Sequence, residues 1–121
     1  MSLVINGLII LLFVWLLVRK IMPDKDVKQM THDDLKKVMG DRKRQFVDVR
    51  TPDEYAGNHI KGFKNIPLHN LTTRLDELSK IKEIVLICQS GMRSNKASKI
   101  LIKKGFAKVT NIQGGMASWK K

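Results

Sequence analysis

The stretch that decides the fold reads Ile84-Val85-Leu86-Ile87-Cys88-Gln89-Ser90-Gly91-Met92-Arg93-Ser94. Four consecutive large apolar residues without alternation predict a strand that is buried on both faces, as in a parallel sheet. Gly91 permits a sharp turn after this strand, and the segment Arg93 to Lys104 has the apolar spacing of an amphipathic helix. We therefore expect a strand, a tight loop and a helix, with the single cysteine at the strand's end.

Further short strands and helices alternate on both sides of this unit. The segment Thr51-Pro52-Asp53-Glu54 combines a threonine cap, a proline at the first helical position and a glutamate at the third, which predicts a helix start. Strands are expected at Gln45–Val49, Asn65–Pro67 and Lys108–Ile112, helices from Thr31 to Gly40 and after Gly114-Gly115, and one helical face at Leu71, Leu75 and Leu78. This alternation predicts an α/β fold with a central parallel sheet flanked by helices on both faces.

Cys88 lies where α/β folds usually place their ligand sites, beyond the carboxyl end of a strand. The backbone N–H groups from Gln89 to Ser94 can curl into a nest, and the following helix adds positive potential. Both effects stabilise a thiolate, the nucleophilic form of cysteine, and would also cradle an anion. A buried, inert cysteine is the alternative for an isolated residue after an apolar run. The glycine, arginine and serine that follow favour a functional loop.

The polar residues of the loop and helix allow more than one role. Arg93 could hold an anionic substrate, or it could have only a structural role, paired with an acidic residue at the base of the loop or lying in solvent. Ser94 is expected in the first helical turn, where its hydroxyl would satisfy a backbone group. Lys96 and Lys99 would solvate the helix and raise the positive potential near the loop.

The N-terminal segment from Leu3 to Val18 is almost entirely apolar and is followed directly by Arg19 and Lys20. A secretory signal has the reverse order, with positive charge before the apolar core and a small-residue cleavage site after it. With Ile21 and Met22 the segment has nearly the length that a spanning helix needs. We expect a transmembrane anchor at residues 1–22, a linker at 23–29 and one domain at 30–121. A buried soluble helix is the alternative, but it would normally have a polar face.

Charge predicts the orientation of this anchor. Arg19, Lys20, Lys25 and Lys28 all follow the apolar segment, and no charged side chain precedes it. The positive-inside rule then predicts a single-pass protein of the cell membrane with its C-terminal domain in the cytoplasm. A single free thiol suits such a reducing compartment.

The chain is strongly basic, with 23 Lys and Arg against 11 Asp and Glu and a net charge of +12. Anionic partners are therefore favoured. Dispersed basic residues, few aromatics and no zinc-finger or RRM signature argue against nucleic acid and favour an anionic membrane surface. One cysteine excludes an internal disulfide and a multi-cysteine metal site, and His32, His59 and His69 lack metal-ligand spacing. We expect no metal.

Four ordered segments together resemble the rhodanese (sulfurtransferase) domain: Phe46–Tyr55, His59–Pro67, Cys88–Ser94 and Gly114–Trp119. The resemblance covers about residues 30 to 120. With its apolar leader, the chain is similar to the small membrane-anchored rhodanese-like proteins of bacteria. Asn58 and Lys61 depart from the residues usual in the family, which affects the expected local backbone and not the chemistry.

The resemblance implies a role for each matching position. Cys88 would be the nucleophile that carries sulfur as a persulfide, and Asp48, Arg50 and Ser94 would support the site. His59 and Trp119 would be structural. The substrate-binding cradle would consist of Gln89, Ser90, Gly91, Met92 and Arg93.

The expected activity is sulfurtransferase: a sulfane sulfur moves from a small anionic donor such as thiosulfate to a thiol or protein acceptor, without a cofactor. The alternative is a membrane-tethered binding module that uses the same fold without turnover. A phosphatase or arsenate reductase is disfavoured, because related phosphatases separate Cys and Arg by five residues, whereas four separate Cys88 and Arg93.

Overall fold

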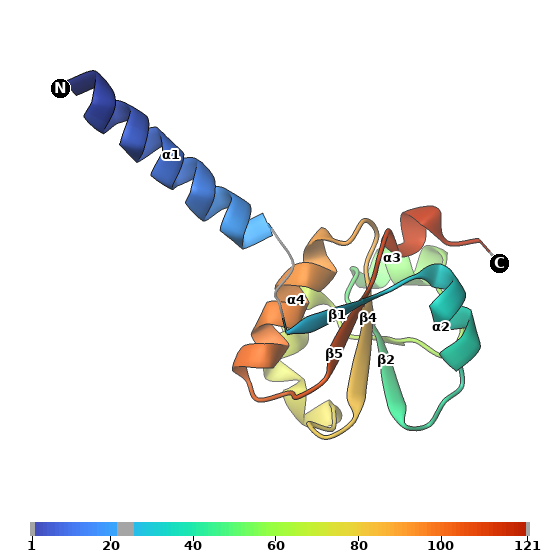
Figure 1. The fold of residues 1–121 in the computed structure, drawn as a ribbon. Coiled ribbons are helices and arrows are strands. Elements are labelled where there is room, and N and C mark those ends of the chain that lie inside the picture. Colours follow the sequence, from blue (N-terminus) through green and yellow to red (C-terminus); the bar gives the residue numbers. More distant parts are fainter. Residues whose placement is uncertain (1, 22–25, 121) are drawn as a thin grey trace.

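The computed structural model describes residues 2–21 and 26–120, and it consists of a layered α/β domain and a separate N-terminal helix (Figure 1). Expectations for residues 1, 22–25 and 121 lie outside the described residues. Helix α1 (Ser2–Ile21) extends away from the domain, and its apolar side chains from Leu3 to Val18 are exposed. Its window Ser2–Arg19 has a mean hydropathy of 2.3 and the length to cross a membrane, properties that an N-terminal signal sequence shares.

The domain is built on a five-stranded sheet in which all pairings are parallel, in the order β1-β5-β4-β2-β3. The strands are β1 (Val27–Met30), β2 (Arg44–Asp48), β3 (Lys64–Asn65), β4 (Glu83–Ile87) and β5 (Val109–Ile112). The central strand β4 is the one predicted from its apolar run, and Ile84 to Ile87 are all fully buried. The parallel sheet expected from the sequence is thereby confirmed.

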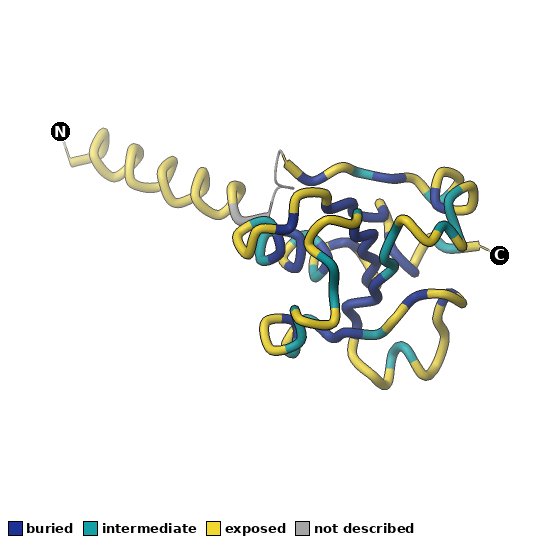
Figure 2. Tube along the Cα trace, turned by 90° about the horizontal axis from the view of Figure 1, so that it is seen from below, coloured by how far each residue is buried: buried dark blue, intermediate teal, exposed yellow. Residues whose placement is uncertain are grey.

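Successive side chains of β4 point to opposite faces of the sheet and pack into two separate hydrophobic cores. Ile84 and Leu86 pack with residues of α4 (Met92–Lys103), whereas Val85 and Ile87 pack on the opposite side with Leu35 of α2 (His32–Val38). Figure 2 shows the buried segments concentrated in the middle of the domain, with exposed turns around them. An unalternating apolar run is thus explained by burial on both faces.

The remaining helices follow their sequence signals with one difference. Helix α3 (Pro52–Gly57) begins with the predicted capping box between Thr51 and Glu54. The leucines expected on one helical face belong instead to two short 3₁₀ helices, η1 (Leu68–Thr73) and η2 (Leu75–Glu77), with Leu78 as the cap of the second. A third, η3 (Gly115–Ser118), follows the glycine pair near the C-terminus.

The expected linker at residues 23–29 is wrong at its C-terminal end, because residues 27–29 lie in strand β1. Val27, Lys28 and Gln29 pair in parallel with β5, and Val27 is buried against the core. The short, mostly polar segment predicts a linker, but edge pairing depends on backbone groups, which any sequence supplies. Residues 27–29 therefore belong to the sheet.

Candidate active site at the end of β4

Cys88 lies at the floor of the loop that joins β4 to α4, and the residue is only 1% exposed. The amide of Gly91 donates a hydrogen bond to Cys88 Sγ at 2.9 Å. Gly91 has a φ of +107°, which glycine adopts without strain and which turns the chain back over the sulfur. Gln89, Ser90 and Met92 are exposed around the loop, so an incoming molecule meets these residues before the sulfur.

Ser94 contributes a second polar contact to the sulfur. Its Oγ lies 3.3 Å from Cys88 Sγ and also donates to the carbonyl of Gly91 at 3.1 Å. The hydroxyl thus satisfies a backbone group in the first turn of α4, as expected, and in addition touches the thiol. A hydroxyl and an amide at this distance can both stabilise negative charge on sulfur.

The backbone of the loop is held from the other side by η3. The amides of Met116 and Ala117 donate to the carbonyls of Cys88 and Gln89 at 2.8 and 2.9 Å. The approach is so close that a Cβ on Gly115 would lie 2.3 Å from the Cys88 carbonyl oxygen. The sequence predicted only a turn at Gly114-Gly115; the contact with the cysteine loop was missed, because it joins segments more than twenty residues apart.

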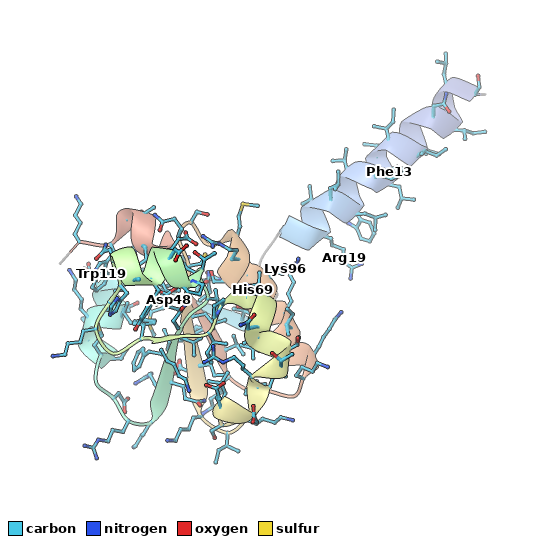
Figure 3. The ribbon with its side chains drawn as sticks, turned by 180° about the vertical axis from the view of Figure 1, so that it is seen from behind. Phe13, Arg19, Asp48, His69, Lys96 and Trp119 are labelled. Atoms are coloured by element: carbon cyan, nitrogen blue, oxygen red, sulfur yellow. The ribbon has the colours of Figure 1, made fainter. Side chains whose placement is uncertain are left out.

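Asp48, which is labelled in Figure 3, is the last residue of β2. It forms a buried ion pair with Arg50, next to the cysteine loop. Arg50 donates from Nε and one terminal nitrogen to the Asp48 carboxylate at 2.9 to 3.1 Å. It also donates to the carbonyl of Asn58 at 2.5 Å, and its other terminal nitrogen lies 3.5 Å from Gln89 Oε1. The pair therefore connects β2 with the loop, while its effect on catalysis stays a prediction.

Arg93 makes a bidentate ion pair with Glu54, the glutamate of the capping box that begins α3. Its two terminal nitrogens donate to the two carboxylate oxygens at 2.5 and 2.8 Å. These hydrogen bonds, helped by those from Thr51, lower the pKa of Glu54 to about 2, and the same pairing raises the pKa of Arg93. The structural alternative for Arg93 is thus realised, whereas contact with a substrate stays a prediction. No periodicity in the sequence identified Glu54 as the partner.

His59 and Trp119 have structural contacts. The His59 ring stacks on Tyr55 with centroids 3.9 Å apart, and its Nδ1 lies 2.8 Å from the Tyr55 carbonyl oxygen. Tyr55 in turn donates its hydroxyl to the carbonyl of Phe63 at 2.5 Å. Trp119 is half-buried against the core that contains Leu35. Both residues therefore fix segments around the sheet.

Comparisons with known proteins agree with this architecture. The sequence of residues 31–121 matches the family model named Rhodanese-like domain. YqhL of Bacillus subtilis (strain 168), which is described as uncharacterized, is 32% identical over 118 residues, covering 94% of this chain and 92% of YqhL. A sulfurtransferase of Allochromatium vinosum is 36% identical over 74 residues, covering 61% of this chain and 69% of that protein.

The likeness extends to experimental structures. The crystal structure of a rhodanese-like domain protein from Staphylococcus aureus superimposes with a TM-score of 0.72 at 32% identity, covering 78% of this chain and 93% of that chain. The family match covers residues 31–121, which contain all four ordered sequence segments and four of the five strands. The chain therefore belongs to the rhodanese-like domain family.

Proposed function

We propose that the protein is a sulfurtransferase that carries a sulfane sulfur as a persulfide on Cys88. The observation that carries the proposal is the sulfur at the floor of its loop, hydrogen-bonded to the Gly91 amide and in contact with the Ser94 hydroxyl. Sulfurtransferases are among the relatives of the chain. The proposed donor is a small anion such as thiosulfate, and the acceptor is a thiol or a protein nucleophile.

The chemistry needs two displacements at sulfur. The Cys88 thiolate attacks the outer sulfur of thiosulfate, forming an S–S bond to Sγ while the bond to the sulfite group breaks, and sulfite leaves with the electron pair. An acceptor thiolate then attacks the terminal sulfur of the persulfide, which regenerates the Cys88 thiolate. The Gly91 amide and Ser94 hydroxyl would stabilise the negative charge that Sγ carries before the first step and after the second.

The sulfur loading of Cys88 is the direct test. We expect the full chain treated with thiosulfate to gain the mass of one sulfur atom, located by peptide mapping on Cys88. Cys88→Ser should remain unmodified and retain its circular dichroism spectrum. Transfer from the loaded protein to cyanide or dithiothreitol should release the same sulfur. A thiol that stays unmodified under saturating donor would favour the non-catalytic binding module, and hydrolysis of a phosphomonoester would favour a phosphatase.

We further propose that α1 anchors the protein in the cell membrane with the domain in the cytoplasm. The helix exposes an apolar surface, and Arg19 at its end lies 5.1 Å from the ring of Trp15, an arrangement suited to a membrane interface. Resistance to carbonate extraction, with the domain digested by protease only after cells are opened, would support this topology. A mature protein that lacks the first twenty or so residues by mass would instead show a cleaved signal.

A further inference from the structure

A groove with a cationic rim lies between η1 and α4, on the side of the domain that carries the helix after the cysteine loop. It encloses about 370 Å³, and we call it the η1–α4 groove. Its lining residues are Val49, Thr51, Pro67, Leu68, His69, Arg93, Lys96 and Ile100. The floor is thus mostly apolar, whereas His69 and Lys96 bring hydrogen-bond donors to the rim. Lys96 also brings positive charge, while the charge of Arg93 is paired with Glu54.

The groove is on the face of the domain that is nearest to the end of α1. Lys99 of α4 donates from Nζ to the carbonyl of Arg19 at 3.2 Å. Lys96 lies three residues before Lys99 and therefore shares its face of α4. Figure 3 shows His69, Lys96 and Arg19 gathered on one side of the molecule, and Figure 1 shows the end of α1 beside α4. If α1 spans a bilayer, this face lies at the headgroups.

We propose that the η1–α4 groove binds the phosphate headgroup of an anionic lipid, so that the domain lies against the membrane on this face. The inference rests on the membrane anchoring proposed above and does not depend on sulfur transfer. Lys96 and His69 supply donors for a phosphate, and the apolar floor suits the glycerol and upper acyl segments of a lipid. A chain with a net charge of +12 is also drawn to a negatively charged leaflet.

The choice of a lipid over a free anion follows from geometry. The groove is open and its floor is apolar. Arg19, which would lie at the membrane interface, accepts a hydrogen bond from Lys99 of α4 through its carbonyl. A lipid whose headgroup occupies the groove also sits next to Arg93, in the first turn of α4 directly after the cysteine loop. Docking therefore places the opening of the cysteine loop close to the bilayer.

The test measures how closely the domain approaches a bilayer. The full chain carries two substitutions: Cys88→Ser removes the native thiol, and Thr72→Cys introduces a single cysteine at an exposed position of η1. A fluorophore is attached to the introduced cysteine, and the protein is reconstituted into vesicles that contain a lipid with a quencher on its headgroup. Quenching should be stronger in phosphatidylcholine with phosphatidylglycerol than in phosphatidylcholine alone. Since one Lys near an anionic surface contributes about 1 kcal/mol, Lys96→Gln should lower the ratio of docked to undocked domain about fivefold.

Lys82→Gln is the matched control, because it removes the same charge near the start of β4, where Lys82 lines a different cavity with Arg42 and Lys108. It should leave quenching unchanged. Equal quenching in neutral and anionic vesicles would overturn the proposal, and so would an equal effect of the two lysine variants, which would indicate only general attraction by net charge. Release of the domain by inorganic phosphate, but not by chloride at equal ionic strength, would assign the groove to a free anion and overturn the lipid.

Discussion

Gly115→Ala should displace the cysteine loop and destabilise the domain, although the substitution adds only one methyl group. A Cβ at this position would lie 2.3 Å from the Cys88 carbonyl oxygen and 2.8 Å from that of Gln89, both of them backbone atoms. Relief of this clash requires η3 to move away, which weakens the two hydrogen bonds that it donates to the loop. Overpacking costs about 1–3 kcal/mol, the two hydrogen bonds together about 2 kcal/mol, and a left-handed alanine at a φ of +54° about 1–2 kcal/mol, so we expect a loss of about 4–7 kcal/mol in the free energy of unfolding.

Gly62→Ala isolates the clash from the cost of backbone conformation. Gly62 also has a positive φ, +99°, but a Cβ there meets nothing within 4 Å. Its substitution should cost only the about 1–2 kcal/mol of a left-handed alanine. Urea unfolding of the full chain in detergent micelles, followed by near-UV circular dichroism, measures both variants. Sulfur loading of Cys88 should slow at least tenfold in Gly115→Ala alone, since a shift of about 1 Å is enough for such a loss. Equal destabilisation of the two variants would refute the reasoning.

Two further predictions concern the ion pairs around the loop. Arg93→Ala should destabilise the domain by about 1 kcal/mol at most, because both side chains of the pair are about one-third exposed. The pKa of Glu54 is about 2 in the folded protein against an ordinary 4.5, so its contribution is complete above pH 4.5 and disappears as the pH falls towards 2. Urea unfolding of the wild-type protein and of Arg93→Ala between pH 4.5 and pH 2 should show their free energies of unfolding converging as the pH falls. A difference that stays constant with pH would contradict the ion pair between Arg93 and Glu54. Asp48→Asn should cost about 3–5 kcal/mol in the same assay, because Arg50 then keeps a buried charge without its partner. The double variant Asp48→Asn/Arg50→Met should recover part of this loss, and a single variant no worse than a surface substitution would show that the pair is not buried in solution.

The local signals of the sequence predicted most of the domain correctly. The apolar run of β4 fixed the centre of a parallel sheet, because only a strand with both faces buried needs no alternation. The capping box of α3 was equally informative, since Thr51 and Glu54 satisfy each other's backbone groups within one turn. Gly91 predicted the turn above Cys88, where the positive φ is in fact found. Each of these signals is complete within a few residues.

Contacts between distant segments were not predictable in the same way. Strand β1 has four residues, which is too short for its pattern to be recognised; it pairs in parallel with β5, and Val27 and Met30 each enter one of the two cores. The partner of Arg93 could have been any acidic residue near the loop, and nothing in the spacing of Glu54 points across 39 residues. The close packing of Gly115 on the Cys88 carbonyl likewise depends on how β5 positions the chain end. Register and packing are properties of the assembled sheet.

The reaction proposed at Cys88 requires that its short loop be held in place, and these long-range contacts hold it. Glu54 fixes the helical end through Arg93, and η3 fixes the carbonyls of Cys88 and Gln89. With both sides anchored, the Gly91 amide stays on the sulfur without further ordering when charge develops there, and such preorganisation is the main way in which a protein stabilises a charged reacting atom. Glu54 therefore has two functions: it begins α3 locally, and it connects α3 to the loop. The Glu54 carboxylate thus belongs both to the capping box of α3, which the local sequence predicts, and to the ion pair with Arg93, which the sequence does not predict.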